Sequence, residues 1–370
     1  MTILVVSALL GLAIALLSVL IWLVARLLGR RRISGRRILK YDGIGFAVAL
    51  PLVIFLVLPV VLASLIAHAS TRPRDQQLNE DPATFGRTYR DVDFQSRDGI
   101  HLKGWFLPGD GARTPVVLAH GLFRDRHEVL ARACELNFFG FPTLLFDFRS
   151  HGLSQKAPIT LGYAERLDVL AAEEFVMEET GIRQVALLGV SMGATACTLA
   201  AAERPDPVTA LVADSAFASL ESTVSRHVHL FLGLPSFPFA NVFIWDLCRI
   251  GKFQAQDLDV LAALKKMPSV PVLLIYGRDD QRMPPVVAES IFAAVLCSTL
   301  DTRNPRLSSQ EQSLGASGQP RMSYTSPVSP HTASIPPVIT TTDRLFSVGH
   351  SRCANRKIGT LRPLRASSMG

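Results

Sequence analysis

The chain has 370 residues, of which 48% are hydrophobic, and its formal net charge is +7. A mean hydropathy of +0.28 and this length exclude an ordinary small soluble domain. The charge is unevenly distributed, with +8 in residues 1–74, −7 in residues 75–296 and +6 in residues 297–370. Because the central segment is acidic, the positive total gives no support to nucleic-acid binding.

Two long apolar runs lie near the N-terminus. Ile3 to Ala25 and Ile44 to Ala67 each contain about 23 residues, enough for a helix to cross a hydrocarbon core of ~30 Å. Pro51 and Pro59 lie inside the second run and are compatible with a kinked span. We expect transmembrane helices over residues 1–28 and 44–68. The alternatives are a signal peptide, which the first run does not resemble, and a buried helical hairpin.

The segment between the two runs, residues 29–43, is rich in arginine and lysine. Short basic loops stay on the cytoplasmic side of a membrane, so the sequence predicts that this loop faces the cytosol. The large domain, joined by a linker over residues 69–86, is then expected on the non-cytoplasmic side. The sequence therefore predicts an integral membrane protein with two spans.

After about Tyr89, short strand-like runs alternate with amphipathic stretches. The runs 91–95 and 100–107 flank Asp98-Gly99, a pair typical of a hairpin turn. The remaining runs have the length and β-branched content of buried parallel strands. We expect strands at 115–119, 142–146, 184–188, 208–213 and 270–276, with helices at 125–138, 161–179 and 192–203. This alternation predicts an α/β domain over residues 87–296, with a mostly parallel sheet covered on both faces.

Two segments depart from this alternation. Residues 215–267 contain many aromatic residues and leucines, and we expect a lid with an apolar lining over the carboxyl ends of the strands. Ordinary packing of the same residues in helices is the alternative. Residues 297–370 are rich in Ser, Thr, Pro and Arg, which is typical of a disordered tail. A change of reading frame after Leu296 is a second explanation for this abrupt change.

The sequence Gly189-Val190-Ser191-Met192-Gly193 follows an apolar strand-like run and begins a helical one. This context is that of a nucleophile elbow, in which the turn is so tight that side chains at Gly189 and Gly193 would collide with their surroundings. The serine then has a strained backbone that raises its hydroxyl above the sheet. Ser191 is the predicted nucleophile, and a serine in an ordinary loop is the alternative.

Two further segments supply the other groups of an acyl-transfer site. His120-Gly121-Leu122-Phe123 follows a predicted strand, and the amides of Leu122 and Met192 are candidate donors to an oxyanion. We interpret His120 as a structural residue rather than as the base. After the last predicted strand, Asp280 is the candidate acid, favoured over Asp279 by its spacing to Met283-Pro284. A surface turn rich in aspartate is the alternative there.

These motifs, with the run from Asp147 to Ser154, resemble the α/β-hydrolase superfamily between about residues 87 and 296. Within it they are similar to the branch of monoacylglycerol lipases and serine-aminopeptidase-like hydrolases, which includes membrane-anchored members. The resemblance implies hydrolysis of esters, thioesters or amides through a covalent acyl-enzyme. It also implies that the run from Asp147 to Ser154 is a structural loop.

The sequence departs from this family where the base is expected. No histidine lies between Asp280 and His331, and residues 300–310 are poor strand formers. His350, preceded by a short apolar run and Gly349, fits the pattern better than His331, so we assign His350 as the candidate base. The alternative is a chain that has lost its last strand and its base.

We expect a serine hydrolase that cleaves an ester, with amide or peptide hydrolysis on the same site as one alternative. A binding protein of the same fold, without an effective base, is the alternative of another class. Five widely spaced cysteines form no metal-ligand pattern, so no metal or organic cofactor is expected. The expected partners are a small-molecule or lipid ester and the membrane.

Overall fold

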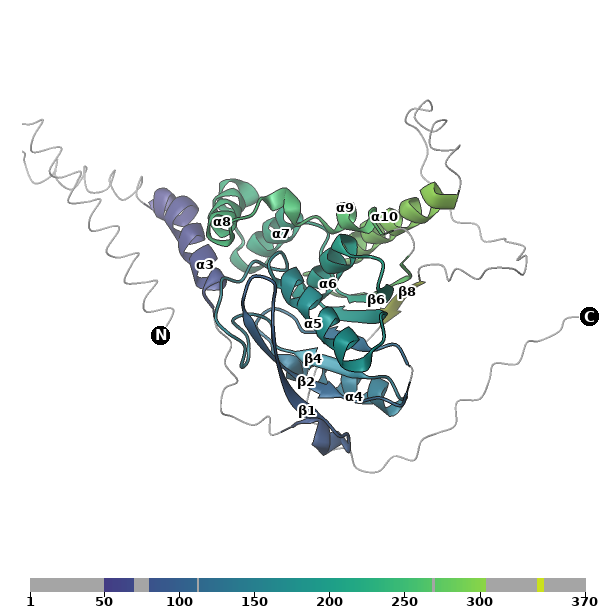
Figure 1. Cartoon of the computed structure of the whole chain (residues 1–370). Helices are drawn as coiled ribbons and strands as arrows, with labels where there is room; N and C mark the ends of the chain where they lie inside the picture. The colour runs from purple at the N-terminus through teal and green to yellow at the C-terminus, as the bar shows by residue number, and fades with distance from the viewer. Residues whose placement is uncertain (1–49, 70–79, 112, 268–269, 304–337, 343–370) are drawn as a thin grey trace, which may run out of the picture.

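The computed structural model describes residues 50–69, 80–111, 113–267, 270–303 and 338–342 (Figure 1). Within these residues one sheet contains eight strands in the order β1-β2-β4-β3-β5-β6-β7-β8. β1 and β2 pair with their neighbours in antiparallel fashion, and the other pairs are parallel. The strands are β1 (Arg90–Gln95), β2 (His101–Leu107), β3 (Val116–Ala119), β4 (Thr143–Phe146), β5 (Val185–Val190), β6 (Val208–Asp214), β7 (Val272–Gly277) and β8 (Val338–Thr342).

The first seven strands confirm the predicted ones within two residues at each end. Apolar β-branched runs of this length are stable when both faces of a sheet are covered, and the packing shows that they are. Val117 and Ala119 face a core cluster that includes residues of α5 (Glu165–Thr180) and α6 (Met192–Glu203). Val116 and Leu118 face the opposite way, against α4 (Leu130–Phe138). The predicted sheet with helices on both faces is therefore confirmed.

The predicted lid segment lies between β6 and β7 and is largely helical. Many of its apolar side chains, including Phe217, Phe239 and Phe243, are buried in the main core, as the alternative of ordinary helix packing expects. Others, including Phe231 and Phe237, are exposed. Its elements are α7 (Leu220–Leu232), α8 (Ser236–Gly251), the 3-10 turn η4 (Ala255–Asp257) and α9 (Val260–Leu264).

The C-terminal part differs from the predicted disordered tail. The boundary expected at residue 297 falls inside α10 (Pro285–Arg303), and β8 lies within the predicted tail. β8 pairs in parallel with β7, with Val338 opposite Leu273 and Thr342 opposite Gly277. Its Val-Ile-Thr-Thr-Thr sequence is β-branched throughout, a composition that suits a strand once an open sheet edge is available.

One helix in the described part of the chain is long and apolar enough to cross a membrane, Leu50–Ala67. It consists of a first turn, the π-helical turn η1 (Val53–Val57) and α3 (Leu58–Ala67). Pro59 has no amide hydrogen for a helical bond, which is compatible with a local change of helix type nearby. This helix covers most of the expected second span, whereas the expected span 1–28 and basic loop 29–43 lie outside the described residues.

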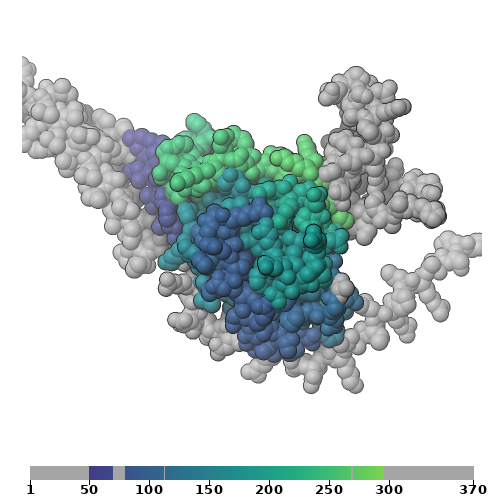
Figure 2. Space-filling model, viewed as in Figure 1, coloured from purple at the N-terminus to yellow at the C-terminus, as the bar shows by residue number. Residues whose placement is uncertain are grey.

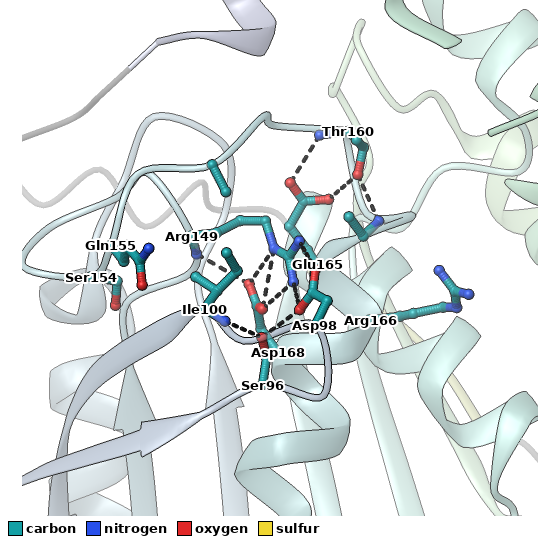
Figure 3. A network of polar contacts seen from close by, with 12 residues as sticks. Ser96, Asp98, Ile100, Arg149, Ser154, Gln155, Thr160, Glu165, Arg166 and Asp168 are labelled. Carbon is teal, nitrogen blue, oxygen red and sulfur yellow. Dashed lines mark hydrogen bonds and ion pairs between the residues drawn. The ribbon is translucent and has the colours of Figure 1, made fainter. Parts of the chain in front are cut away.

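A buried ionic network ties the loop after β4 to two other elements (Figure 3). The Arg149 guanidinium donates to Asp168 of α5 at 2.6 Å and to Asp98 of the β1–β2 turn at 2.7 Å. Arg149 is 3% exposed, and Asp168 is fully buried. Burial raises the pKa of Asp168 to about 6, although the Arg149 guanidinium opposes this effect. The segment from Asp147 to Ser154 is thus held by buried charges, which supports its interpretation as a structural loop.

Replacement of Arg149 by methionine is expected to lower the free energy of unfolding by about 3–5 kcal/mol, because a buried carboxylate loses its counter-charge. Arg97→Met is the matched control, because Arg97 pairs with Glu174 on the surface, and a change of no more than about 1 kcal/mol is expected there. Chemical denaturation of the purified variants measures both. Equal effects of the two substitutions would contradict this account.

Candidate active site

Ser191 lies in the turn between β5 and α6, and its backbone is strained. Its φ of 53° and ψ of −114° are unusual for a residue with a side chain. A Cβ atom at Gly189 would lie 2.4 Å from the carbonyl carbon of Gly193, and one at Gly193 would lie 2.5 Å from the carbonyl oxygen of Ala119. Only glycine fits at either position. The strand–turn–helix geometry expected around Ser191 is therefore present.

The turn is fixed to the neighbouring strand through its backbone. The Ser191 amide donates to the carbonyl of Asp214, the last residue of β6, at 2.7 Å, and the Thr195 amide donates to the Ser191 carbonyl at 3.1 Å. The Ser191 side chain is partly exposed. Within the described part of the chain, no side chain is hydrogen-bonded to its hydroxyl. The hydroxyl is thus available to a substrate and to a base.

The loop after β3 lies directly beside Ser191. A Cβ atom at Gly121 would be 3.5 Å from the Cβ of Ser191. Both neighbouring amides have partners, because Gly121 donates to Glu128 at 2.6 Å and Phe123 donates to the His151 ring at 3.3 Å. The Leu122 amide between them donates no hydrogen bond among the described residues. This loop is therefore close enough to supply a donor to a group bound at Ser191.

The Met192 amide is the other predicted oxyanion donor. Met192 is the first residue of α6, so its N–H has no carbonyl one turn earlier in the helix to receive it. The N-terminus of a helix also carries partial positive charge, which favours a developing negative charge nearby. The Met192 amide directly follows Ser191, and the Leu122 amide belongs to the loop beside it, so both predicted donors lie near this serine.

Glu128 is a site residue that the sequence analysis missed. Besides accepting the Gly121 amide, its carboxylate lies 3.6 Å from Arg124, and burial raises its pKa. Arg132 of α4, whose charge acts against this rise in pKa, is itself paired with Asp214 at 2.8 Å. The only sequence signal for Glu128 was its spacing of seven residues from Gly121, within a helical turn after a loop. It holds the loop that carries Leu122.

Two histidines near the site are structural. His120 is fully buried, with Nδ1 donating to the Gly121 carbonyl at 2.8 Å and Nε2 accepting the Phe148 amide at 3.0 Å. His151 donates from Nδ1 to the Arg149 carbonyl at 2.8 Å and accepts the Phe123 amide at Nε2. Because both ring nitrogens are engaged in each residue, neither is free to act as the base. This agrees with the structural role expected for His120.

Asp280 follows β7 and lies at the same edge of the sheet as Ser191, because β5, β6 and β7 are parallel. Its side chain is 10% exposed, and Oδ1 accepts the amides of Arg282 at 2.8 Å and Met283 at 3.1 Å. These bonds fix the carboxylate in the turn before α10. The position suits the predicted acid, and Asp279, with an exposed side chain, is placed less well.

His350 and His331, the two candidate bases, lie outside the described residues. β8 nevertheless separates them, because His331 precedes Val338 by seven residues and His350 follows Thr342 by eight. The carboxyl end of β8 lies beside Gly277, three residues before Asp280. The chain therefore returns to the edge that carries Asp280 shortly before His350, whereas His331 comes before the opposite end of the strand.

Comparison with known proteins agrees with this fold. A profile of the α/β hydrolase fold matches residues 114–267. The uncharacterized protein Rv2307c of Mycobacterium tuberculosis is 29% identical over 211 residues, 55% of this chain and 66% of that protein. Thiohydrolase aneE of Aspergillus aculeatus is 34% identical over 116 residues, 30% of this chain and 36% of that protein. The chain thus matches slightly less than two thirds of Rv2307c.

Among solved structures, the Pyrococcus furiosus esterase Pf2001 superposes with a TM-score of 0.50 at 24% identity, over 62% of this chain and 85% of that one. At this identity the likeness shows the fold. The strand order, the turn around Ser191 and the matching profile together show the α/β hydrolase fold. Residues 114–267 are thus similar to the α/β hydrolase family.

Gly193→Ala is expected to lower the free energy of unfolding by at least about 1–3 kcal/mol, because the new methyl group would overlap the Ala119 and His120 carbonyl oxygens. Gly277→Ala is the matched control. A Cβ there would lie 3.4 Å from its nearest neighbour, so a neutral or slightly stabilising effect of up to about 1 kcal/mol is expected. Thermal denaturation of both variants checks this, and a tolerated Gly193→Ala would refute the tight turn.

The histidine environment predicts how stability depends on pH. Burial lowers the pKa of His120 to about 4, whereas histidine in an unfolded chain titrates near 6.5. Between these values the unfolded chain binds a proton that the folded chain does not, so stability falls as the pH decreases from about 6.5 to 4. His120→Asn is expected to reduce this slope in denaturation curves at pH 5 and pH 7. Equal slopes in both proteins would contradict it.

Proposed function

We propose that this chain is a membrane-anchored serine hydrolase that cleaves a carboxylic ester through an acyl-enzyme on Ser191. The observation that carries the proposal is the strained backbone of Ser191, held between two glycines that admit no side chain and beside the Gly121 loop. A strained serine with an accessible hydroxyl at the carboxyl edge of a parallel sheet suits a nucleophile.

In the proposed reaction, Ser191 Oγ attacks the ester carbonyl carbon while His350 accepts the hydroxyl proton. The amides of Leu122 and Met192 stabilise the oxyanion that develops. His350 then gives the proton to the leaving alcohol, and the acyl group stays on Ser191. Water, deprotonated by the same histidine, releases the acid and restores the serine. Asp280 orients the histidine and stabilises its charged form.

The substrate class is an acyl ester, with a thioester as a close variant. The relative aneE is described as a thiohydrolase, and the fold neighbour Pf2001 is described as an esterase. Both reactions use the same nucleophile and oxyanion donors. The helix Leu50–Ala67 supports anchoring in a membrane, which favours a lipid-like acyl substrate. We propose two spans, with the hydrolase domain on the non-cytoplasmic side.

Two other functions are compatible with this site. An amide or peptide hydrolase would use the same groups, since acyl transfer from an amide needs the same nucleophile and oxyanion hole. A chain without an effective base would bind acyl ligands but turn them over poorly, with only a residual ~10³–10⁴-fold acceleration.

A fluorophosphonate probe that reacts with activated serines is expected to label the full-length chain, and Ser191→Ala is expected to abolish labelling. His350→Ala is expected to reduce ester hydrolysis by roughly 10³-fold or more, because the nucleophile loses its base. Asp280→Asn is expected to reduce it by about 10³–10⁴-fold.

His331→Ala is the matched control, and wild-type labelling and turnover are expected from it. Well-folded protein that is not labelled at Ser191 would favour a binding protein. Loss of activity in His331→Ala with full activity in His350→Ala would reverse the assignment of the base. Hydrolysis rates on matched ester and amide substrates distinguish an ester hydrolase from an amide or peptide hydrolase.

A further inference from the structure

We infer that the tip of the α7–α8 insertion, from Leu230 to Trp245, inserts into the same membrane leaflet as the apolar helix Leu50–Ala67. This inference rests on the membrane anchoring in the proposed function, but not on catalysis. It assigns the insertion a binding surface for lipid acyl chains. Three features of the structure support it: α3 packs against α8, the two helices run in the same direction, and exposed apolar and charged side chains are segregated along the insertion.

The apolar helix and α8 pack against each other. Ala63 and Ala67 of α3 are fully buried, and small residues of this kind allow close approach of two helices. The Ser64 hydroxyl donates to the Asp246 carboxylate of α8 at 3.2 Å, and the π-helical turn η1 also contacts α8. Figure 2 shows the purple N-terminal helix lying against the green residues of the insertion.

The two helices run in the same direction. The last residue of α3, Ala67, accepts the Ile159 amide at 2.7 Å. The last residue of α8, Gly251, lies against Thr160, the residue that follows Ile159 in the chain. A Cβ atom at Gly251 would be 2.6 Å from Thr160 Cγ2. Both C-termini therefore meet the same point of the hydrolase domain. α8 and the apolar helix remain in contact along their length, so the N-terminal ends of both helices lie away from that domain.

The depth of the tip follows from helix geometry. Ser64 and Asp246 form a polar level near the C-terminal ends of the two helices, and Arg249 donates to the same carboxylate at 2.7 Å. From Asp246 to Phe239 is seven residues, or about 10 Å along the helix. Half of a hydrocarbon core is about 15 Å thick. If the Ser64–Asp246 hydrogen bond lies at the membrane surface, the tip of the insertion therefore lies within one leaflet.

The tip exposes large apolar side chains on its surface. Phe237 is 75% exposed, Phe231 64% and Trp245 61%. Contact of three large aromatic side chains on one short segment with water would be unfavourable. The apolar helix adds exposed side chains of its own, among them Leu52, Leu56, Val57 and Leu65. Because α3 and α8 are packed together, a bilayer that covers one helix also reaches the other.

The distribution of charged residues along the insertion agrees with an apolar tip inside the membrane and basic residues at its surface. No Asp, Glu, Lys or Arg occurs between Leu230 and Trp245. Arg226 of α7 and Arg249 of α8 lie on either side of this uncharged stretch, and the Arg249 guanidinium is 5.9 Å from the centre of the Trp245 ring. Basic and aromatic side chains next to an apolar segment are typical of the boundary between headgroups and acyl chains.

Depth-dependent fluorescence quenching tests the inference on the full-length chain. The sequence contains three tryptophans, Trp22, Trp105 and Trp245. Trp22→Phe with Trp105→Phe leaves Trp245 as the only tryptophan. The chain is reconstituted in phosphatidylcholine vesicles whose acyl chains carry bromine either near the headgroup or near the chain end. Trp245 is expected to lose roughly half of its fluorescence with bromine near the headgroup, and less with bromine near the chain end.

Two further single-tryptophan chains, in which Trp245→Phe is added, give the matched comparison. Phe237→Trp places the probe at the tip, and quenching by the deeper bromine is expected. Phe138→Trp places it at the end of α4, where the native side chain is similarly exposed at 65%, and no quenching is expected. Both native rings lie on the surface, so neither substitution requires repacking of the core.

Each outcome decides the inference. Strong quenching at positions 237 and 245 with none at 138 supports it. A chain that floats with the vesicles while 237 and 245 stay unquenched overturns the inference and leaves the anchoring intact. A chain that does not float overturns both. Equal quenching at 138 and 237 also overturns it, because the contact would then not be specific to the insertion. Fluorophosphonate labelling of the same chains reports on Ser191 separately.

Discussion

The geometry of the site depends on two positions in the turn after β5 where the backbone leaves no room for a side chain. Gly189 and Gly193 bring strand, helix and the end of β3 so close together that no methyl group fits between them. Ser191, placed between these two glycines, then adopts a positive φ at an energetic cost of order 1–3 kcal/mol. The surrounding sheet offsets this cost, because the Ser191 amide bonds to the last carbonyl of β6. Steric exclusion therefore determines where the hydroxyl lies.

The parallel sheet brings together residues that are far apart in sequence. β3, β5 and β7 end at one edge, so Gly121, Ser191 and Asp280 all lie at that edge although they span 160 positions of the chain. Buried charges hold the loops between these strands, as the pairing of Arg126 with Asp147 at 2.7 Å illustrates. Gly152 permits that arrangement, since a Cβ there would lie 2.1 Å from the Asp147 carboxylate.

The sequence predicted the seven strands up to Gly277 and the turn around Ser191, because apolar periodicity and glycine spacing are local signals. It did not predict β8, since a five-residue strand at a sheet edge depends on pairing with β7 rather than on its own pattern. Glu128 was missed for a similar reason. Its role arises from a contact with Gly121 that only the folded loop creates. The direction of α8 relative to the apolar helix is likewise a tertiary property.

The distant origin of β8 has a consequence for the order in which the domain is assembled. Thirty-four residues separate α10 from this strand, so Ser191, Leu122, Met192 and Asp280, the residues of the proposed site, are all synthesised well before the sheet closes. Until then β7 presents an unpaired edge, which is a site for incorrect pairing with other chains. Completion of the sheet is thus a late step, and a premature stop codon in the connection would leave β7 as an unpaired strand at the edge of the sheet.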